Sequence, residues 1–103
     1  MAIQNTLLGT SPTAISPIQT SDSAITVVMF CNLNTTTENI DVHAVKQGDA
    51  PDDVNKIVNQ APIGPSDTFI FSSERLVLGA GDRLYALTTT ADQVSVTLSY
   101  VVI

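Results

Sequence analysis

The sequence predicts an all-β protein: an antiparallel β-sandwich of about eight strands, jelly-roll or Ig-like in outline. Apolar and polar residues alternate with a period of two in the last third of the chain, most clearly over residues 94–100. This period belongs to half-buried strands. Aromatic residues make up only 5% of the chain, so β-branched and small apolar residues must fill the core, which favours pleated sheets. Short strands separated by evenly spaced turns are typical of sandwiches and barrels.

The chain has 103 residues, a length that suits a single domain. Residues 21–103 are expected to form the sandwich, and residues 1–20 form an extended N-terminal arm or supply the first strands. Within this segment strands are expected at 3–8 and 13–19, with a Gly-Thr-Ser-Pro turn signal between them. Such an arm adds a strand to a neighbour's sheet or pairs within its own sandwich, and the sequence leaves both open.

The strongest predicted strand covers residues 24–33 and is apolar on both faces. Strict alternation places Ile25 and Val27 on one face and Val28 and Phe30 on the other. A strand of this kind is central in its sheet, or it faces a partner subunit as well as the core. Because Val28 and Phe30 face away from the other set, we expect them at a partner interface.

Hairpins account for most of the remaining chain. A loop at 34–39 leads to a strand with Ile40 and Val42 pointing inward and Asp41 and His43 pointing outward. A long loop is expected at 47–53, followed by a strand or one helical turn at 54–60. The loop at 61–66 contains two prolines, which exclude a central strand. Four strands then follow, at 68–72, 75–78, 82–89 and 93–102.

Two glycines and an aspartate, Gly79, Gly81 and Asp82, lie between two of these strands. A phosphate-binding loop needs a helix N-terminus after its glycines, whereas a strand follows here. Glycines that permit a positive φ explain the motif as a tight turn, in which Asp82 accepts hydrogen bonds from local backbone amides.

Composition excludes several classes of function. The net charge is −6 and the four basic residues are dispersed, which disfavours nucleic-acid binding. No apolar run approaches the roughly 20 residues of a membrane span, and the N-terminus lacks the features of a signal peptide. The single cysteine, Cys31, allows no intrachain disulfide and is expected to be a small buried hydrophobe.

No constellation of residues predicts catalysis. His43 is the only histidine and has no nearby nucleophile or metal-ligand pattern, so we expect a surface or interface histidine. Asp49, Asp52 and Asp53 lack the spacing of an EF-hand and are expected to form a solvated acidic loop. Whether that loop binds a cation stays open. We expect no enzyme, no cofactor and no metal site.

The chain ends on an apolar segment from Tyr100 to Ile103. Such a segment must be buried in its own core or against a partner, so Tyr100 and Ile103 join the candidate interface residues.

Three stretches resemble small, capsid decoration-like virion structural proteins of tailed bacteriophages. The first joins a Gly-Thr-Ser-Pro-Thr turn at 9–13 to a strand ending in Phe-Cys-Asn-Leu-Asn at 30–34. The second is Pro-Ile-Gly-Pro-Ser at 62–66. The third is Arg-Leu-Val-Leu-Gly-Ala-Gly-Asp-Arg-Leu at 75–84, with a closing Val-Ser-Val-Thr-Leu-Ser-Tyr strand at 94–100.

The resemblance implies a non-enzymatic virion subunit made in the host cytoplasm, and most directly a capsid decoration (cement) protein that stabilises the head. Its expected partners are the major capsid protein and copies of itself, in a symmetric oligomer such as a trimer. The alternatives are a neck, tail or fibre-associated ring subunit and a receptor- or carbohydrate-binding sandwich. Position in the particle, copy number and host stay open.

Overall fold

The computed structural model describes residues 2–17, 20–71 and 76–103. Over these residues it contains nine strands and one 3₁₀ turn, η1 (Asp53–Asn55). The strands are β1 (Ala2–Leu7), β2 (Thr13–Ala14), β3 (Ser23–Asn32), β4 (Glu38–Val45), β5 (Lys56–Ile63), β6 (Thr68–Phe71), β7 (Val77–Leu78), β8 (Arg83–Thr88) and β9 (Val94–Val102). Ser72 and Arg75, which the sequence placed in two of the predicted strands, lie outside the described residues.

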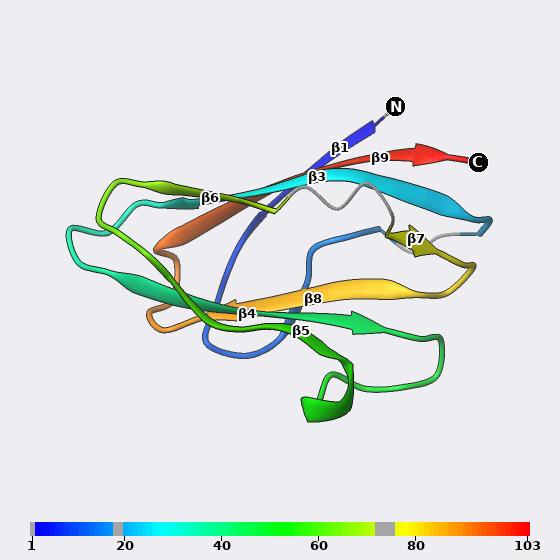
Figure 1. Ribbon diagram of the computed structural model, residues 1–103, viewed down its shortest axis with the longest axis horizontal. Coiled ribbons are helices and arrows are strands. Elements are labelled where there is room, and N and C mark those ends of the chain that lie inside the picture. The colour runs from blue at the N-terminus through cyan, green and yellow to red at the C-terminus, as the bar shows by residue number, and fades with distance from the viewer. Residues whose placement is uncertain (1, 18–19, 72–75) are drawn as a thin grey trace.

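The strands form two antiparallel sheets packed face to face (Figure 1). One sheet has the order β1-β9-β3-β6, with β7 also pairing with β3, and the other has the order β2-β8-β4-β5. The first strand therefore pairs with the last, the second pairs with the last but one, and each of the first three connections crosses from one sheet to the other. This is the order of a jelly roll, and it differs from the ABED and CFG sheets of an Ig-like sandwich. The predicted all-β sandwich is confirmed.

The N-terminal segment belongs to its own sandwich. β1 runs antiparallel to β9 from the pair Ala2 and Tyr100 to the pair Leu7 and Ser95, and β2 pairs with β8. The chain after β2 is held by Ser16, whose Oγ accepts a hydrogen bond of 2.9 Å from the Leu84 amide. Of the two arrangements that the sequence left open, the structure has the second.

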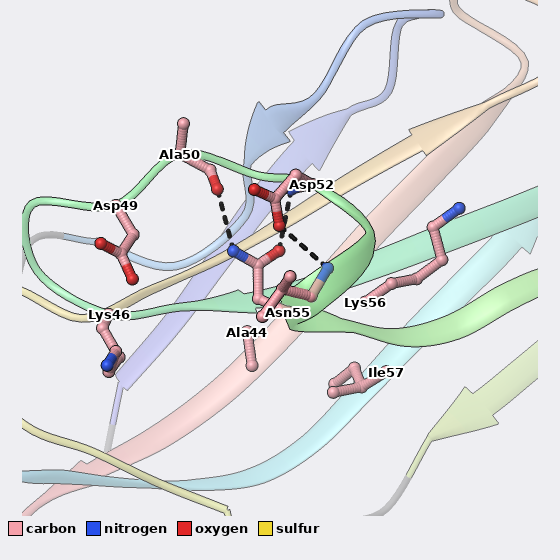
Figure 2. Close-up of a pocket in the computed structure, with 9 residues that line it drawn as sticks. Ala44, Lys46, Asp49, Ala50, Asp52, Asn55, Lys56 and Ile57 are labelled. Carbon is pink, nitrogen blue, oxygen red and sulfur yellow. Dashed lines mark hydrogen bonds between the residues drawn. The ribbon is translucent and has the colours of Figure 1, made fainter.

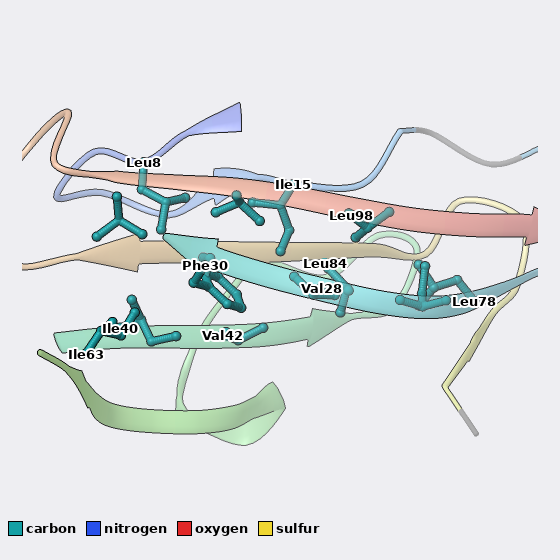
Figure 3. Packing of buried hydrophobic residues seen from close by; sticks show 14 residues of the cluster. Leu8, Ile15, Val28, Phe30, Ile40, Val42, Ile63, Leu78, Leu84 and Leu98 are labelled. Atoms are coloured by element: carbon teal, nitrogen blue, oxygen red, sulfur yellow. The ribbon is translucent and has the colours of Figure 1, made fainter. Parts of the chain in front are cut away.

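The core lies between the sheets and consists almost entirely of aliphatic side chains (Figure 3). Phe30 lies near its centre, fully buried, with its ring 6.1 Å from that of Phe69. The other buried members are Leu8, Ile15, Ile25, Val28, Ile40, Val42, Ile63, Leu78, Leu84, Ala86, Val94, Val96 and Leu98. Burial of this apolar surface provides the main stabilising free energy of the fold.

The predicted faces of β3 are wrong over most of the strand. The pairing of β3 with β9 shifts register between Ile25 and Val27, so that Thr26 is an extra residue in the strand. A bulge of this kind reverses the phase of alternation. Ile25 points into the core, and so do Val28 and Phe30, which are both completely buried. These two side chains are therefore not available to a partner, contrary to the prediction.

The loop expected at 61–66 is partly wrong, because its first three residues, 61–63, belong to β5. Pro62 pairs with Asn39 in the ladder between β5 and β4, and β5 is the edge of its sheet, a position where proline is tolerated. The ladder shifts register twice. Gln60 has a φ of 54°, and its amide donates a 2.7 Å hydrogen bond to the buried carboxylate of Asp41.

Candidate functional site

The five-stranded sheet has an outer face without a charged side chain among the described residues. Burial alternates along its strands, and the register places the outward side chains in rows across the sheet. We call this surface the outer face; it consists of Ile3, Asn5, Leu7, Ala24, Val27, Met29, Cys31, Thr68, Ile70, Val77, Ser95, Thr97, Ser99 and Val101.

The middle row of the outer face shows its character. Asn5, Thr97, Met29 and Ile70 lie side by side on four neighbouring strands, and the Thr97 hydroxyl donates a 3.0 Å hydrogen bond to Asn5 Oδ1. Short hydroxyl side chains on β9 thus lie between longer side chains on β1 and β3, most of which are apolar. Depletion of charge and enrichment in apolar side chains are typical of the buried centre of a protein–protein interface.

The opposite sheet carries charges on its outer side. Lys56 Nζ lies 3.8 Å from carboxylate oxygens of both Asp41 and Asp53. The Arg83 guanidinium donates a 3.0 Å hydrogen bond to the Ser16 carbonyl and lies 6.0 Å from the centre of the Tyr85 ring. The two sides of the sandwich therefore differ sharply in polarity.

A pocket of about 560 Å³ lies beside the loop between β4 and β5 (Figure 2). Its polar groups are largely engaged by the loop itself. Asp52 Oδ1 accepts a 2.9 Å hydrogen bond from the Val54 amide, Asn55 Oδ1 accepts one of 3.0 Å from the Asp52 amide, and Asn55 Nδ2 donates to the Ala50 carbonyl. The lining consists of Ala44, Lys46, Asp49, Ala50, Asp52, Val54, Asn55, Lys56 and Ile57.

His43 holds this loop against β4, and the prediction of a surface or interface histidine is wrong, because the chain itself covers the ring. The ring is buried, and its Nδ1 lies 2.9 Å from the Asp52 carbonyl and 3.0 Å from Asn55 Oδ1. Both partners are acceptors, because Asn55 donates through its own Nδ2 to Ala50. Nδ1 therefore carries the proton, and the histidine acts as a structural donor.

The three loop aspartates do not converge. Asp52 caps η1, Asp53 lies beside Lys56, and Asp49 lines the pocket. Across the residues that the structure describes, no three His, Cys, Asp or Glu side chains come together in a way that would hold a metal ion. The described part of the chain also contains no helix long and apolar enough to cross a membrane.

Glu38 is a buried carboxylate, although its sequence context favours a solvent-facing charge. It accepts hydrogen bonds from Asn34 Nδ2 at 3.0 Å, from the Thr88 hydroxyl at 3.0 Å and from the Thr90 amide at 2.8 Å. Burial raises the pKa of Glu38, but the hydrogen bonds from Asn34, Thr90 and Thr88 outweigh it, so the pKa lies below its ordinary value. Three segments of the chain meet at this ionised group.

The Glu38 interactions predict a pH-dependent stability. Because the folded-state pKa is lowered, the carboxylate contributes stability above the unfolded pKa of about 4.3 and loses it as pH falls through the folded value. Glu38→Gln should lower the free energy of unfolding at neutral pH by about 1.5–3 kcal/mol and flatten its decline below that unfolded pKa, in urea titrations at several pH values. The exposed Asp49→Asn is the control, and an unchanged pH slope in Glu38→Gln would contradict this role.

The Gly79–Asp82 segment forms a tight turn. Asp82 Oδ2 accepts a 2.9 Å hydrogen bond from the Gly79 amide, and Asp82 Oδ1 accepts one of 3.0 Å from the Gln47 amide. Gly81 has a φ of +86°, and a Cβ there would lie 2.7 Å from the Gln47 side chain. The glycines thus have a geometric role, and Asp82 joins this turn to the loop after β4.

The remaining interface candidates lie at the end of β9. Tyr100 is half-buried and packs against the core, whereas Ile103 is exposed and its amide donates a 2.8 Å hydrogen bond to the Asp22 carbonyl. Of the four predicted interface residues, Ile103 is therefore accessible to solvent and Tyr100 is partly accessible, whereas Val28 and Phe30 are not. The outer face itself was not predicted, because the bulge in β3 that sets it has no clear sequence signal.

Comparisons with known proteins returned no match: no family model, curated protein or solved structure is significantly similar to this chain.

Proposed function

We propose that this chain is a non-enzymatic structural protein of a tailed-bacteriophage virion, a capsid decoration protein that attaches to the head through its outer face. The outer face carries the proposal. In a chain with a net charge of −6, a whole sheet surface without a described charged residue exposes apolar side chains and can be covered by a partner without desolvating a charge.

Sequence and fold support the same proposal by separate routes. The turn and strand motifs at 9–13, 62–66 and 75–100 resemble those of small phage virion proteins. Jelly rolls occur in viral capsid and lectin domains, a likeness of architecture rather than of site. A sugar-binding site would favour exposed aromatic rings, but Tyr85 lies beside Arg83 and Tyr100 packs against the core.

The mechanism would be mechanical. Each copy would lay the rows of Ile3, Met29 and Ile70 against neighbouring capsid subunits, burying apolar side chains and short hydroxyls without desolvating a charge. The contact would add free energy to the assembled shell alone, since only the shell presents the matching surface. Head expansion or rupture would then require the loss of these contacts.

The proposal is tested on particles. In gradient-purified virions of a phage that encodes the chain, mass spectrometry should find it as a stoichiometric component, and immunogold labelling should mark the head. Purified chain should also bind expanded heads prepared after deletion of its gene. Absence from the particles would overturn the proposal, and labelling of the neck, tail or fibres would instead support the ring-subunit alternative.

A matched pair of variants links head binding to the outer face. Ile70 on β6 and Val54 on η1 are both exposed, at 60% and 94%, but they lie on opposite sides of the sandwich. Ile70→Lys should abolish head binding and Val54→Lys should leave it unchanged, with circular dichroism showing that both variants fold. Equal binding by the two variants would show that attachment does not use the outer face.

A further inference from the structure

β1 is an edge strand without the usual protection against pairing. It pairs only with β9 among the described strands, and its sequence from Ala2 to Leu7 has no charge, proline or bulge. The other edges are blunted: β2 has two residues, β6 and β7 are short, and β5 contains Lys56, Pro62 and two register shifts. Proteins usually block free edges with such devices, because an open edge presents unpaired backbone groups to another strand.

The backbone groups that β1 turns outward can be identified. The Leu8 amide donates a 2.9 Å hydrogen bond to the Val94 carbonyl of the neighbouring strand. Since alternate residues of a strand bond to the same side, Gln4 and Thr6 also bond toward β9. The N–H and C=O groups of the intervening residues, Ile3, Asn5 and Leu7, therefore point away from β9, toward the free edge.

The side chains at this edge are apolar where water would favour polar ones. Ile3 is 67% exposed and Leu7 is 49% exposed, and they flank Asn5 symmetrically, two residues on either side. An antiparallel strand centred on Asn5 would place a residue equivalent to Leu7 beside Ile3. A second copy of β1, related to the first by a two-fold rotation through Asn5, places its own Leu7 at that position.

We propose that a second copy of this chain pairs with β1, antiparallel and in a register centred on Asn5. Asn5 then exchanges two backbone hydrogen bonds with Asn5 of the second copy, and Ile3 lies beside Leu7 of the second copy, with the reciprocal pair on the other side. Together the three pairs form six backbone hydrogen bonds. The contact is isologous, the commonest symmetry of homo-oligomers, and it adds strand to strand as in β-augmentation.

Charge also favours a second copy at this edge. Each chain carries a net charge of −6, so two copies associate most readily where neither presents a charged residue. Pairing at β1 meets this condition and keeps the acidic loop between β4 and β5 on the opposite sheet. The two five-stranded sheets become continuous, and their outer faces form one wider uncharged surface. The inference thus deepens the proposed function by naming the contact between copies.

The test is the oligomeric state of the purified full chain, which is independent of any head preparation. Sedimentation equilibrium should show reversible association from 10.9 kDa to twice that mass as the protein concentration rises, because a contact of this size is weak. Ile3→Lys places a charge at the paired edge, and Asn5→Pro removes an outward N–H group that β9 does not use. Both variants should remain monomeric with a wild-type circular dichroism spectrum.

Ile70→Lys is the matched control, because Ile70 lies on the same outer face but away from β1. It should dimerise like the wild type although it fails to bind heads, which separates this inference from the proposed function. If Asn5→Pro does not fold, Ile3→Lys still decides the outcome. A wild-type chain that stays monomeric throughout, or association that Ile70→Lys abolishes and Ile3→Lys retains, would overturn the proposal.

Discussion

Phe30→Ala is expected to have the largest effect on the stability of the domain. The ring is fully buried between the sheets and contacts Phe69, and truncation of a buried phenylalanine costs about 3–5 kcal/mol because it leaves a cavity. Domains of this size are stable by only about 5–15 kcal/mol. Urea unfolding of the variant should therefore show a much lower midpoint with an unchanged slope.

Met29→Ala provides the matched control for Phe30→Ala. Met29 precedes Phe30 in the same strand but lies on the outer face, where it is partly exposed. Its truncation should therefore lower the free energy of unfolding by less than about 1 kcal/mol. Equal losses from the two substitutions, or a larger loss from Met29→Ala, would mean that β3 has the phase given by strict alternation and not the phase set by the bulge.

Asn32→Ala is expected to have the second-largest effect. The buried side chain donates to the carbonyls of Thr36, Ile63 and Gly64 at 3.0, 2.9 and 3.1 Å, and its Oδ1 accepts a 2.8 Å hydrogen bond from the Asn34 amide. It thereby joins the end of β3 to the following loop and to the end of β5. The variant leaves several of these groups without a partner, at a cost of about 2–4 kcal/mol.

The loss in Asn32→Ala should appear in thermal melts as a fall in Tm of roughly 8–30 °C, at about 4–8 °C per kcal/mol for a domain of this size. The exposed Asn59→Ala, which removes a side-chain hydrogen bond with Lys56, should change Tm by only a few degrees. A small effect of Asn32→Ala would show that water replaces the lost amide and that the joint is not structural.

The strand content was predictable from sequence because period-two alternation is a local property. β8 and β9 follow it closely, with Leu84, Ala86 and Leu98 inward, and the glycine turn before β8 lies where its residues predict. The phase of β3 was not predictable. It depends on an extra residue at Thr26, which only the register with β9 reveals. Because of this residue, Val28 and Phe30 point into the core and not toward the predicted interface.

The burial of polar groups was also beyond local patterns. His43 and Asp41 alternate with apolar residues as solvent-facing positions should, whereas Glu38 has the phase of the inward residues Ile40 and Val42; all three are buried. His43 and Asp41 bond to the loop before β5 and to β5 itself, whereas Glu38 bonds to the segment after β8. These partners lie far along the chain and become neighbours only in the folded sandwich. The uncharged outer face could not be predicted for the same reason, since it is made of side chains from five strands that become neighbours only on folding.

Together these features describe a module with one polar side, one uncharged side and one open edge. The polar side holds the loops in place, through His43 on the Asp52 carbonyl and Lys56 between two aspartates. The uncharged side is the proposed attachment surface, and the pairing proposed at β1 would extend it across two copies.

Amide hydrogen exchange along β1, followed residue by residue by NMR, tests the pairing of two copies most directly. The account predicts that the Gln4 and Thr6 amides, which bond to β9, are protected at every protein concentration. The Ile3, Asn5 and Leu7 amides should exchange quickly in dilute solution and become protected as the concentration rises. Fast exchange of these three amides in concentrated solution would contradict it.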